Sequence, residues 1–176
     1  MAEETARAAL LPGTVDQLFK QFRFEEAAQT LSRQLSSYKT EEGKRAAAEV
    51  AERYRLGAEL FAYLVQQLSA APLRWGWERS RGVSEDILGA DKEGVKLRDR
   101  VVPWPKVSQG QLVRFVDRFV VLEKAGSPTK QARLFLGAAM FFRETGSPAL
   151  AKRYVEKAVA AAPHMQAEAI RLVPVE

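Results

Sequence analysis

The chain of 176 residues contains no cysteine and only one histidine. Without cysteine there are no disulfides, no thiolate metal sites and no cysteine nucleophile. His164 follows Pro163 and has no carboxylate at metal-ligand spacing, so we interpret it as a solvent-exposed loop residue. A Gly-rich phosphate loop, a nucleophile-elbow serine and a zinc-helix motif are also missing from the sequence. These absences predict a non-enzymatic protein with no metal and no cofactor.

Long apolar runs are missing as well. No run reaches the roughly 18 residues that a membrane helix needs. The first residues are acidic, whereas a secretory signal starts with basic residues and continues with apolar ones. The chain as given is therefore expected to be soluble, with the cytoplasm favoured and no membrane partner. A longer parent protein could carry an anchor outside this chain.

The composition is that of a folded globular protein. Hydrophobic residues make up 47% and charged residues 28%, far from the values of disordered chains. The length favours one domain over residues 1–176. The formal net charge is +5, and its largest part, +4, lies in residues 73–130. This excess is weaker than the clustered basic stripe of a dedicated nucleic-acid-binding protein.

A proline-free stretch from Thr40 to about Ser69 predicts one long helix. Thr40 can cap its start, and the two glutamates that follow suit the helix dipole. Apolar and small residues then recur at alternating spacings of four and three. They are Val50, Tyr54, Gly57, Phe61, Leu64 and Leu68. This stripe predicts that one face of the helix lies against neighbouring elements.

Shorter helices are expected on both sides of the long one. Thr14 can cap a helix over the following residues, and a second helix begins near Phe24. Ser108 is a further candidate N-cap. Helical patterns continue over about 109–124, 129–144, 148–161 and 165–172. Residues 73–107 break the pattern with glycines and short apolar stretches, which predicts a small three-stranded β-meander as an insertion.

Residues 132–163 resemble a tetratricopeptide repeat. The repeat pattern of that family has bulky, small and aromatic residues, a turn glycine, two alanines and a closing proline at fixed spacing. These places hold Phe135, Ala139, Phe142, Gly146, Ala151, Ala158 and Pro163. A weaker copy covers residues 18–31, with Phe22 in place of the turn glycine. The resemblance implies antiparallel helix pairs that cross closely at Ala139 and Ala151.

The expected fold is therefore mainly α, with tetratricopeptide-like antiparallel helix pairs, one long helix and the β insertion. Residues 82–104 also look like a small β insertion found in helical regions of some large bacterial proteins. Tetratricopeptide pairs bind peptides along their first helices, which here implies a surface of Arg133, Leu136, Met140 and Arg143. We predict a protein-protein interaction or scaffolding module, part of a larger bacterial protein, with a protein or peptide partner.

The alternative prediction is a nucleic-acid-binding module. Its candidate surface consists of Arg74, Trp75, Trp77, Arg79 and Arg81. Arginines can hold phosphates while tryptophans stack on bases. The competing interpretation is that the tryptophans, Trp104 included, cover one face of the meander and pack it onto the long helix.

Three other roles follow from single features. Carboxylate pairs at 25–26, 41–42 and 85–86 could supply an acid and a base. The first two pairs begin helices, where stabilising the dipole is sufficient reason for them. A purely architectural role, spacing the domains of a longer chain, is another alternative. A homo-oligomer would be favoured if the 50–68 stripe were exposed.

Overall fold

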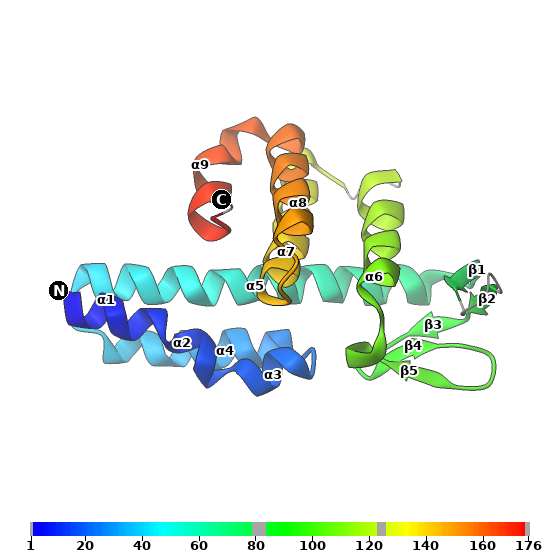
Figure 1. Cartoon of the computed structure of the whole chain (residues 1–176), viewed down its shortest axis with the longest axis horizontal. Helices are drawn as coiled ribbons and strands as arrows, with labels where there is room; N and C mark the ends of the chain where they lie inside the picture. The colour runs from blue at the N-terminus through cyan, green and yellow to red at the C-terminus, as the bar shows by residue number, and fades with distance from the viewer. Residues whose placement is uncertain (1, 79–83, 123–125, 175–176) are drawn as a thin grey trace. The chain divides into compact units, whose positions relative to one another are not determined.

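The structure is a computed structural model that describes residues 2–78, 84–122 and 126–174. It is mainly helical and divides into two compact units (Figure 1). The first unit combines residues 1–60 with 126–176, and the second covers 61–125. The second unit is larger than the insertion predicted at 73–107, because it includes the end of the long helix and the helix after the strands.

The first unit is built from helices. Its N-terminal part contains α1 (Ala2–Ala9), α2 (Leu11–Thr14), α3 (Asp16–Lys20), α4 (Phe24–Gln34) and the 3-10 helix η1 (Leu35–Ser37). The long helix α5 (Glu41–Ala70) follows, and its residues up to Leu60 belong to this unit. Its C-terminal part contains α7 (Pro128–Glu144), α8 (Pro148–Ala161), the 3-10 helix η4 (Pro163–Met165) and α9 (Gln166–Leu172).

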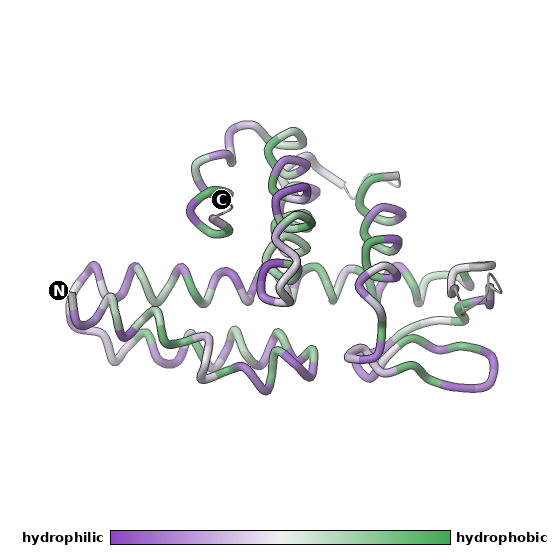
Figure 2. The backbone as a smooth tube through the Cα atoms, viewed as in Figure 1, coloured by the Kyte–Doolittle hydropathy of each residue, from purple (hydrophilic) through white to green (hydrophobic). Residues whose placement is uncertain are grey.

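The long helix confirms the prediction made from the proline-free stretch. The Thr40 hydroxyl accepts a hydrogen bond from the Gly43 backbone N–H at 3.1 Å, which is the expected N-cap contact. Hydrophobic and hydrophilic residues alternate along α5 in Figure 2, as expected for a helix with a buried face. All six members of the 50–68 stripe are buried. The chain's own packing therefore covers the stripe, which leaves no exposed face there for self-association.

The start of α5 is tied to α1 by the carboxylate of Glu4. This carboxylate accepts hydrogen bonds from the backbone N–H groups of Lys39 (3.0 Å) and Thr40 (2.9 Å), and from the Thr40 hydroxyl. The bond from the Thr40 hydroxyl, followed by those from the two backbone groups, lowers the pKa of Glu4 to about 2. A surface contact thus joins two helices that are about 30 residues apart in the sequence.

This contact predicts a pH dependence of stability. Because the pKa of Glu4 is lower in the folded state than its usual 4.5, the contact stabilises the fold above about pH 4.5. Its contribution is lost as the pH falls toward 2. We expect Glu4→Gln to flatten the pH profile of the urea midpoint in this window, while Glu3→Gln, at an exposed neighbouring position, leaves it unchanged. Equal profiles for wild type and Glu4→Gln would contradict the assignment.

The N-terminal helices differ from the prediction in two ways. Residues 2–9 form α1, which the sequence patterns did not predict. Thr14 ends α2 and does not cap the next helix: its hydroxyl donates to the Leu11 carbonyl at 2.7 Å. Pro12 at the first turn of α2 explains this, because proline is favoured there and lets the helix begin before Thr14. The predicted cap at Thr14 was therefore wrong.

Phe22 has the left-handed backbone conformation that the turn glycine would adopt. Its φ is +61°, and Gly146, in the turn between α7 and α8, has a φ of +76°. The Phe22 ring packs against Phe24 (centroids 5.5 Å apart) and Phe141 (5.4 Å). These aromatic contacts offset the cost of the left-handed conformation, which is about 1–2 kcal/mol for a residue with a side chain.

A pair of variants at this position separates the two effects. Both Phe22→Ala and Phe22→Gly remove the ring contacts, but only glycine relieves the left-handed backbone. We expect the Gly variant to be about 1 kcal/mol more stable than the Ala variant in urea unfolding. At an ordinary helical position the order is the reverse. An Ala variant as stable as the Gly variant would show that the turn carries no strain.

Helices α7 and α8 pack against each other as an antiparallel pair, with α8 in front of α7 in Figure 1. The Ser127 hydroxyl caps α7 by accepting from the Lys130 N–H at 3.2 Å. Ala139 and Ala151 are fully buried, as expected for the residues at a close crossing. Phe135 and Phe142 lie inside the pair, where both rings stack on Tyr154 of α8. The tetratricopeptide resemblance stays a prediction from the residues.

The second unit contains the strands and one more helix. Its elements are β1 (Leu73–Glu78), β2 (Ser84–Ile87), β3 (Gly89–Ala90), β4 (Gly94–Lys96), β5 (Val101–Pro103), the 3-10 helix η2 (Trp104–Lys106), α6 (Gln109–Val116) and the π-helix η3 (Asp117–Leu122). The Ser108 hydroxyl accepts from the Gln111 N–H at 3.2 Å, so its predicted role as N-cap is confirmed. The predicted 109–124 helix widens into a π-helix after Val116.

The predicted three-stranded meander is present as the antiparallel sheet β3-β4-β5. Strands β1 and β2 form a separate antiparallel hairpin, which the sequence patterns did not predict. The Ser69 hydroxyl, on α5, donates to the Ala90 carbonyl of β3 at 2.6 Å. The Gln111 side chain, on α6, donates to the Gly76 carbonyl of β1 at 2.6 Å. These two bonds join both sheets to helices of the same unit.

Candidate functional site

The face of α7 that was predicted to bind a peptide is mostly buried. Leu136 is 0% exposed and Met140 is 1% exposed, so neither can form part of an accessible surface. The reason is a close crossing with α5: a Cβ at Gly137 would lie 2.3 Å from the Leu56 carbonyl oxygen. The same crossing brings Met140 against Gly57 of α5. The long helix therefore takes the place predicted for the peptide.

The sequence did carry a signal for this outcome. Residues 134–142 read LFLGAAMFF, nine consecutive residues without a polar side chain, and all nine are buried. A helix that is apolar on all sides is buried on all sides. This composition predicts a central helix of the core, and it argues against a helix that lines an open groove.

Arg133 is engaged within the chain. Its guanidinium donates to both carboxylate oxygens of Glu59 (2.9 and 2.8 Å) and to Glu52 (2.8 Å), both on α5. The bond to Glu59 raises the pKa of Arg133, burial opposes the increase, and Glu52 adds to it. Burial works to raise the pKa of Glu59, but the bond and the charge of Arg133, together with those of Arg55, outweigh it and lower that pKa. Arg133 thus links α7 to α5.

Arg143, in the last turn of α7, is the one residue of this predicted set that is exposed. Its charge lies near Arg53 of α5. The pKa of Arg53 is lowered mainly by burial, and the positive charge of Arg143 is the second cause. The buried Nε atom of Arg53 has no hydrogen-bond partner in the described part of the chain. The four predicted residues therefore do not come together as one surface.

The basic tryptophan segment lies in the second unit. Arg74 is exposed on β1, and Trp77 on the same strand is half-buried. The side chain of Trp75, together with Arg79 and Arg81, lies outside the described residues. A predicted nucleic-acid surface made of these five residues is therefore only partly placed by the structure.

Trp104 belongs to the core of this unit. It is 2% exposed, its ring meets Phe61 of α5 edge-on at 5.4 Å, and its Nε1 donates to the Asp91 carbonyl at 2.8 Å. The interpretation that tryptophan packs the meander onto the long helix is confirmed for this residue. Its ring is not available for stacking on a base.

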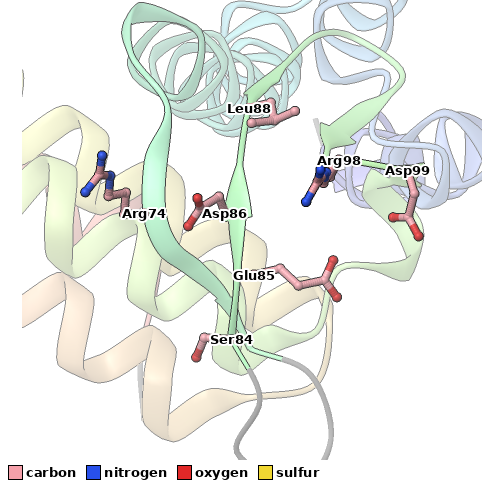
Figure 3. A pocket seen from close by; sticks show the side chains of 7 residues that line it. All are labelled: Arg74, Ser84, Glu85, Asp86, Leu88, Arg98 and Asp99. Carbon is pink, nitrogen blue, oxygen red and sulfur yellow. The ribbon is translucent and has the colours of Figure 1, made fainter.

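A concavity of about 970 Å³ lies beside β2 and is called the β2 hollow below. Its lining residues are Arg74, Ser84, Glu85, Asp86, Leu88, Arg98 and Asp99. They come from β1, from β2 and the residue after it, and from the turn between β4 and β5. Figure 3 shows Glu85 extending toward that turn, and Arg74 and Arg98 on opposite sides of the view. Three separate segments thus build the hollow.

Charges in the β2 hollow are unequally paired. Arg100 donates to Glu85 at 3.1 Å and to Asp99 at 2.9 Å, so two of the lining carboxylates already have a cationic partner. Arg74 and Arg98 are exposed, and within the described ranges neither has a hydrogen bond or an ion pair. Leu88 is 51% exposed. The hollow therefore presents two exposed guanidinium groups and one exposed apolar side chain, next to the exposed carboxylate of Asp86.

Comparison with protein families, curated proteins and solved structures found no match. The assignment of a function therefore depends on the residues and the geometry of this chain. Within the described ranges, no helix is long and apolar enough to cross a membrane. In the same ranges, no three metal-binding side chains form a cluster.

The remaining candidates from the sequence have structural roles or are exposed. His164 lies at the surface in η4. The glutamates at 25–26 and 41–42 occupy the first turns of α4 and α5, where they complement the helix dipoles. The pair at 85–86 lies in the β2 hollow. The sequence did not single out Leu88, because two apolar residues, Ile87 and Leu88, follow the acidic pair and only burial distinguishes the exposed one.

Proposed function

We propose that this chain is a non-enzymatic protein-protein interaction or scaffolding module. The observation that carries the proposal is the α7–α8 pair, which has small residues at its crossing, a left-handed glycine at its turn and rings stacked inside it. These features suit a domain whose interior serves packing and whose surface serves contacts. Buried Gln111 also serves the framework, because its side chain bonds to the Gly76 carbonyl.

The covered face of α7 limits how such a module would work. A partner would not enter the groove that stacked repeats offer, because α5 occupies that face through Leu56 and Gly57. Contacts with a partner would have to use the outer surfaces. The scaffolding form of the proposal rests on the same packing, because the close-packed interior of each unit holds the outer surface of that unit in a fixed shape.

Reconstitution with purified components tests the proposal. The chain would be used to capture proteins from its host. Each captured protein would then be purified and titrated into the chain by calorimetry. We expect at least one partner to form a complex of fixed stoichiometry. Failure of every captured protein to bind after purification, together with a mobility shift of RNA or single-stranded DNA that salt abolishes, would favour the nucleic-acid alternative instead.

A further inference from the structure

Resting on the proposed interaction function, we infer that the β2 hollow binds an extended acidic peptide of a partner protein, with an apolar side chain of the peptide on Leu88. Arg74 and Arg98, which are exposed and have no hydrogen bond or ion pair among the described residues, supply the charge for this contact. Guanidinium groups bind carboxylates through two parallel hydrogen bonds, and such charge-assisted bonds are stronger than neutral ones. The hollow thus offers the peptide two anchors and one apolar contact.

The size and shape of the hollow fit a peptide segment. A volume of about 970 Å³ accommodates several side chains. Arg74 comes from β1 and Arg98 from the β4–β5 turn, on opposite sides of the hollow in Figure 3. A ligand that reaches both must be elongated. Leu88, which follows β2, adds apolar area that favours an aliphatic residue between two acidic ones.

The carboxylates of the hollow favour a peptide over a nucleic acid. Glu85, Asp86 and Asp99 line the same surface as the two arginines. A phosphate backbone carries a charge at every step and would meet these carboxylates with like charge. A peptide can place isolated acidic side chains opposite the arginines and leave neutral residues opposite the carboxylates. Buried Trp104 also removes one of the three rings on which bases could stack.

Fluorescence anisotropy with a defined peptide set tests the inference. The probes are labelled peptides on a Gly/Ser background, with two aspartates three to eight residues apart and a leucine between them. Reference peptides carry lysine for aspartate, or serine for leucine. We expect at least one acidic peptide to bind the full chain, its lysine version not to bind, and its serine version to bind several-fold more weakly. Binding of none of the acidic peptides would overturn the inference.

Matched variants show where the peptide binds. Arg74→Glu with Arg98→Glu should weaken binding at least about tenfold. The control, Lys92→Glu with Lys106→Glu, changes the charge equally at exposed residues of the same unit outside the hollow, and should change binding less than twofold. Leu88→Ser tests the apolar contact without a change of charge. Equal losses in both charge variants, or equally tight binding of a thymidine oligonucleotide, would overturn the inference.

The captured partner distinguishes this inference from the proposed function. A partner that binds the wild-type chain and the Arg74→Glu, Arg98→Glu variant equally well would leave the interaction function standing and refute the role of the β2 hollow. A partner whose affinity falls in that variant, and not in the control, would support both. Circular dichroism spectra and Tm values are measured for each variant. Values equal to those of the wild type show that a loss of binding is not caused by misfolding.

Discussion

Replacing Gly137 with alanine should lower the free energy of unfolding by about 2 kcal/mol. The added Cβ would lie 2.3 Å from the Leu56 carbonyl oxygen and 3.0 Å from the Leu60 Cβ, so α5 and α7 would have to move apart. Overpacking of this kind costs about 1–3 kcal/mol, here at the upper end because the atom it meets is backbone. The better helix propensity of alanine returns about 1 kcal/mol.

Gly110→Ala is the matched control for this variant. Gly110 is also helical, in α6, but a Cβ there would meet nothing within 4 Å. We expect this variant to be unchanged or more stable by up to about 1 kcal/mol. Urea unfolding of the two variants gives the comparison. If Gly137→Ala were as stable as Gly110→Ala, the close crossing of α5 and α7 would be wrong.

Removing the guanidinium of Arg133 should lower the free energy of unfolding by about 2 kcal/mol. Arg133→Met keeps the aliphatic stem but leaves Glu52 and Glu59 without their partner on α7. These side chains are 23–35% exposed, so the expected loss lies between the small value of a surface pair and the 3–5 kcal/mol of a fully buried one. Arg133→Lys should lose about 1 kcal/mol, because lysine cannot bond both oxygens of Glu59 in the same way.

The pH dependence of this loss provides a second check. Arg133 lowers the folded-state pKa of Glu59, so the pair stabilises the fold at neutral pH and loses this effect as the pH falls through that lowered pKa. In Arg133→Met the partly buried Glu59 favours protonation. The difference in stability between wild type and variant should therefore shrink from pH 7 toward pH 3. A small difference that does not vary with pH would show that the network contributes little.

Predictions for the caps and the long helix succeeded where local chemistry decides the structure. Thr40 and Ser108 cap their helices because a side-chain oxygen three residues before a free N–H is a local arrangement. The bounds of α5 follow from the absence of proline and from a sustained apolar stripe. The start of α2 shows the limit of this reasoning. Pro12 and Thr14 both suit a helix start, and the helix begins at Leu11, with Pro12 in its first turn.

Features that depend on distant segments could not be predicted in this way. Helix α1 contains little apolar surface, and contacts to remote residues hold it: Glu4 to Lys39 and Thr40, and Arg7 to Ser37 at 3.0 Å. The β1–β2 hairpin is another case, because it is joined to α6 through the Gln111 side chain. Periodicity is a property of one segment, whereas these contacts require knowledge of which segments meet.

By itself the sequence determined a mainly helical chain with one long helix, an antiparallel α7–α8 pair and a small meander, because capping, periodicity and turn residues act within a few residues of one another. Only the tertiary structure decided which surfaces stay open. It placed α5 across Leu136 and Met140 and paired Arg133 with Glu52 and Glu59. Beside β2 it left Arg74 and Arg98 exposed, with no hydrogen bond or ion pair to any residue that the structure describes. The exposure of a side chain depends on which other residues pack against it, and those residues come from distant parts of the sequence that only the tertiary structure brings together.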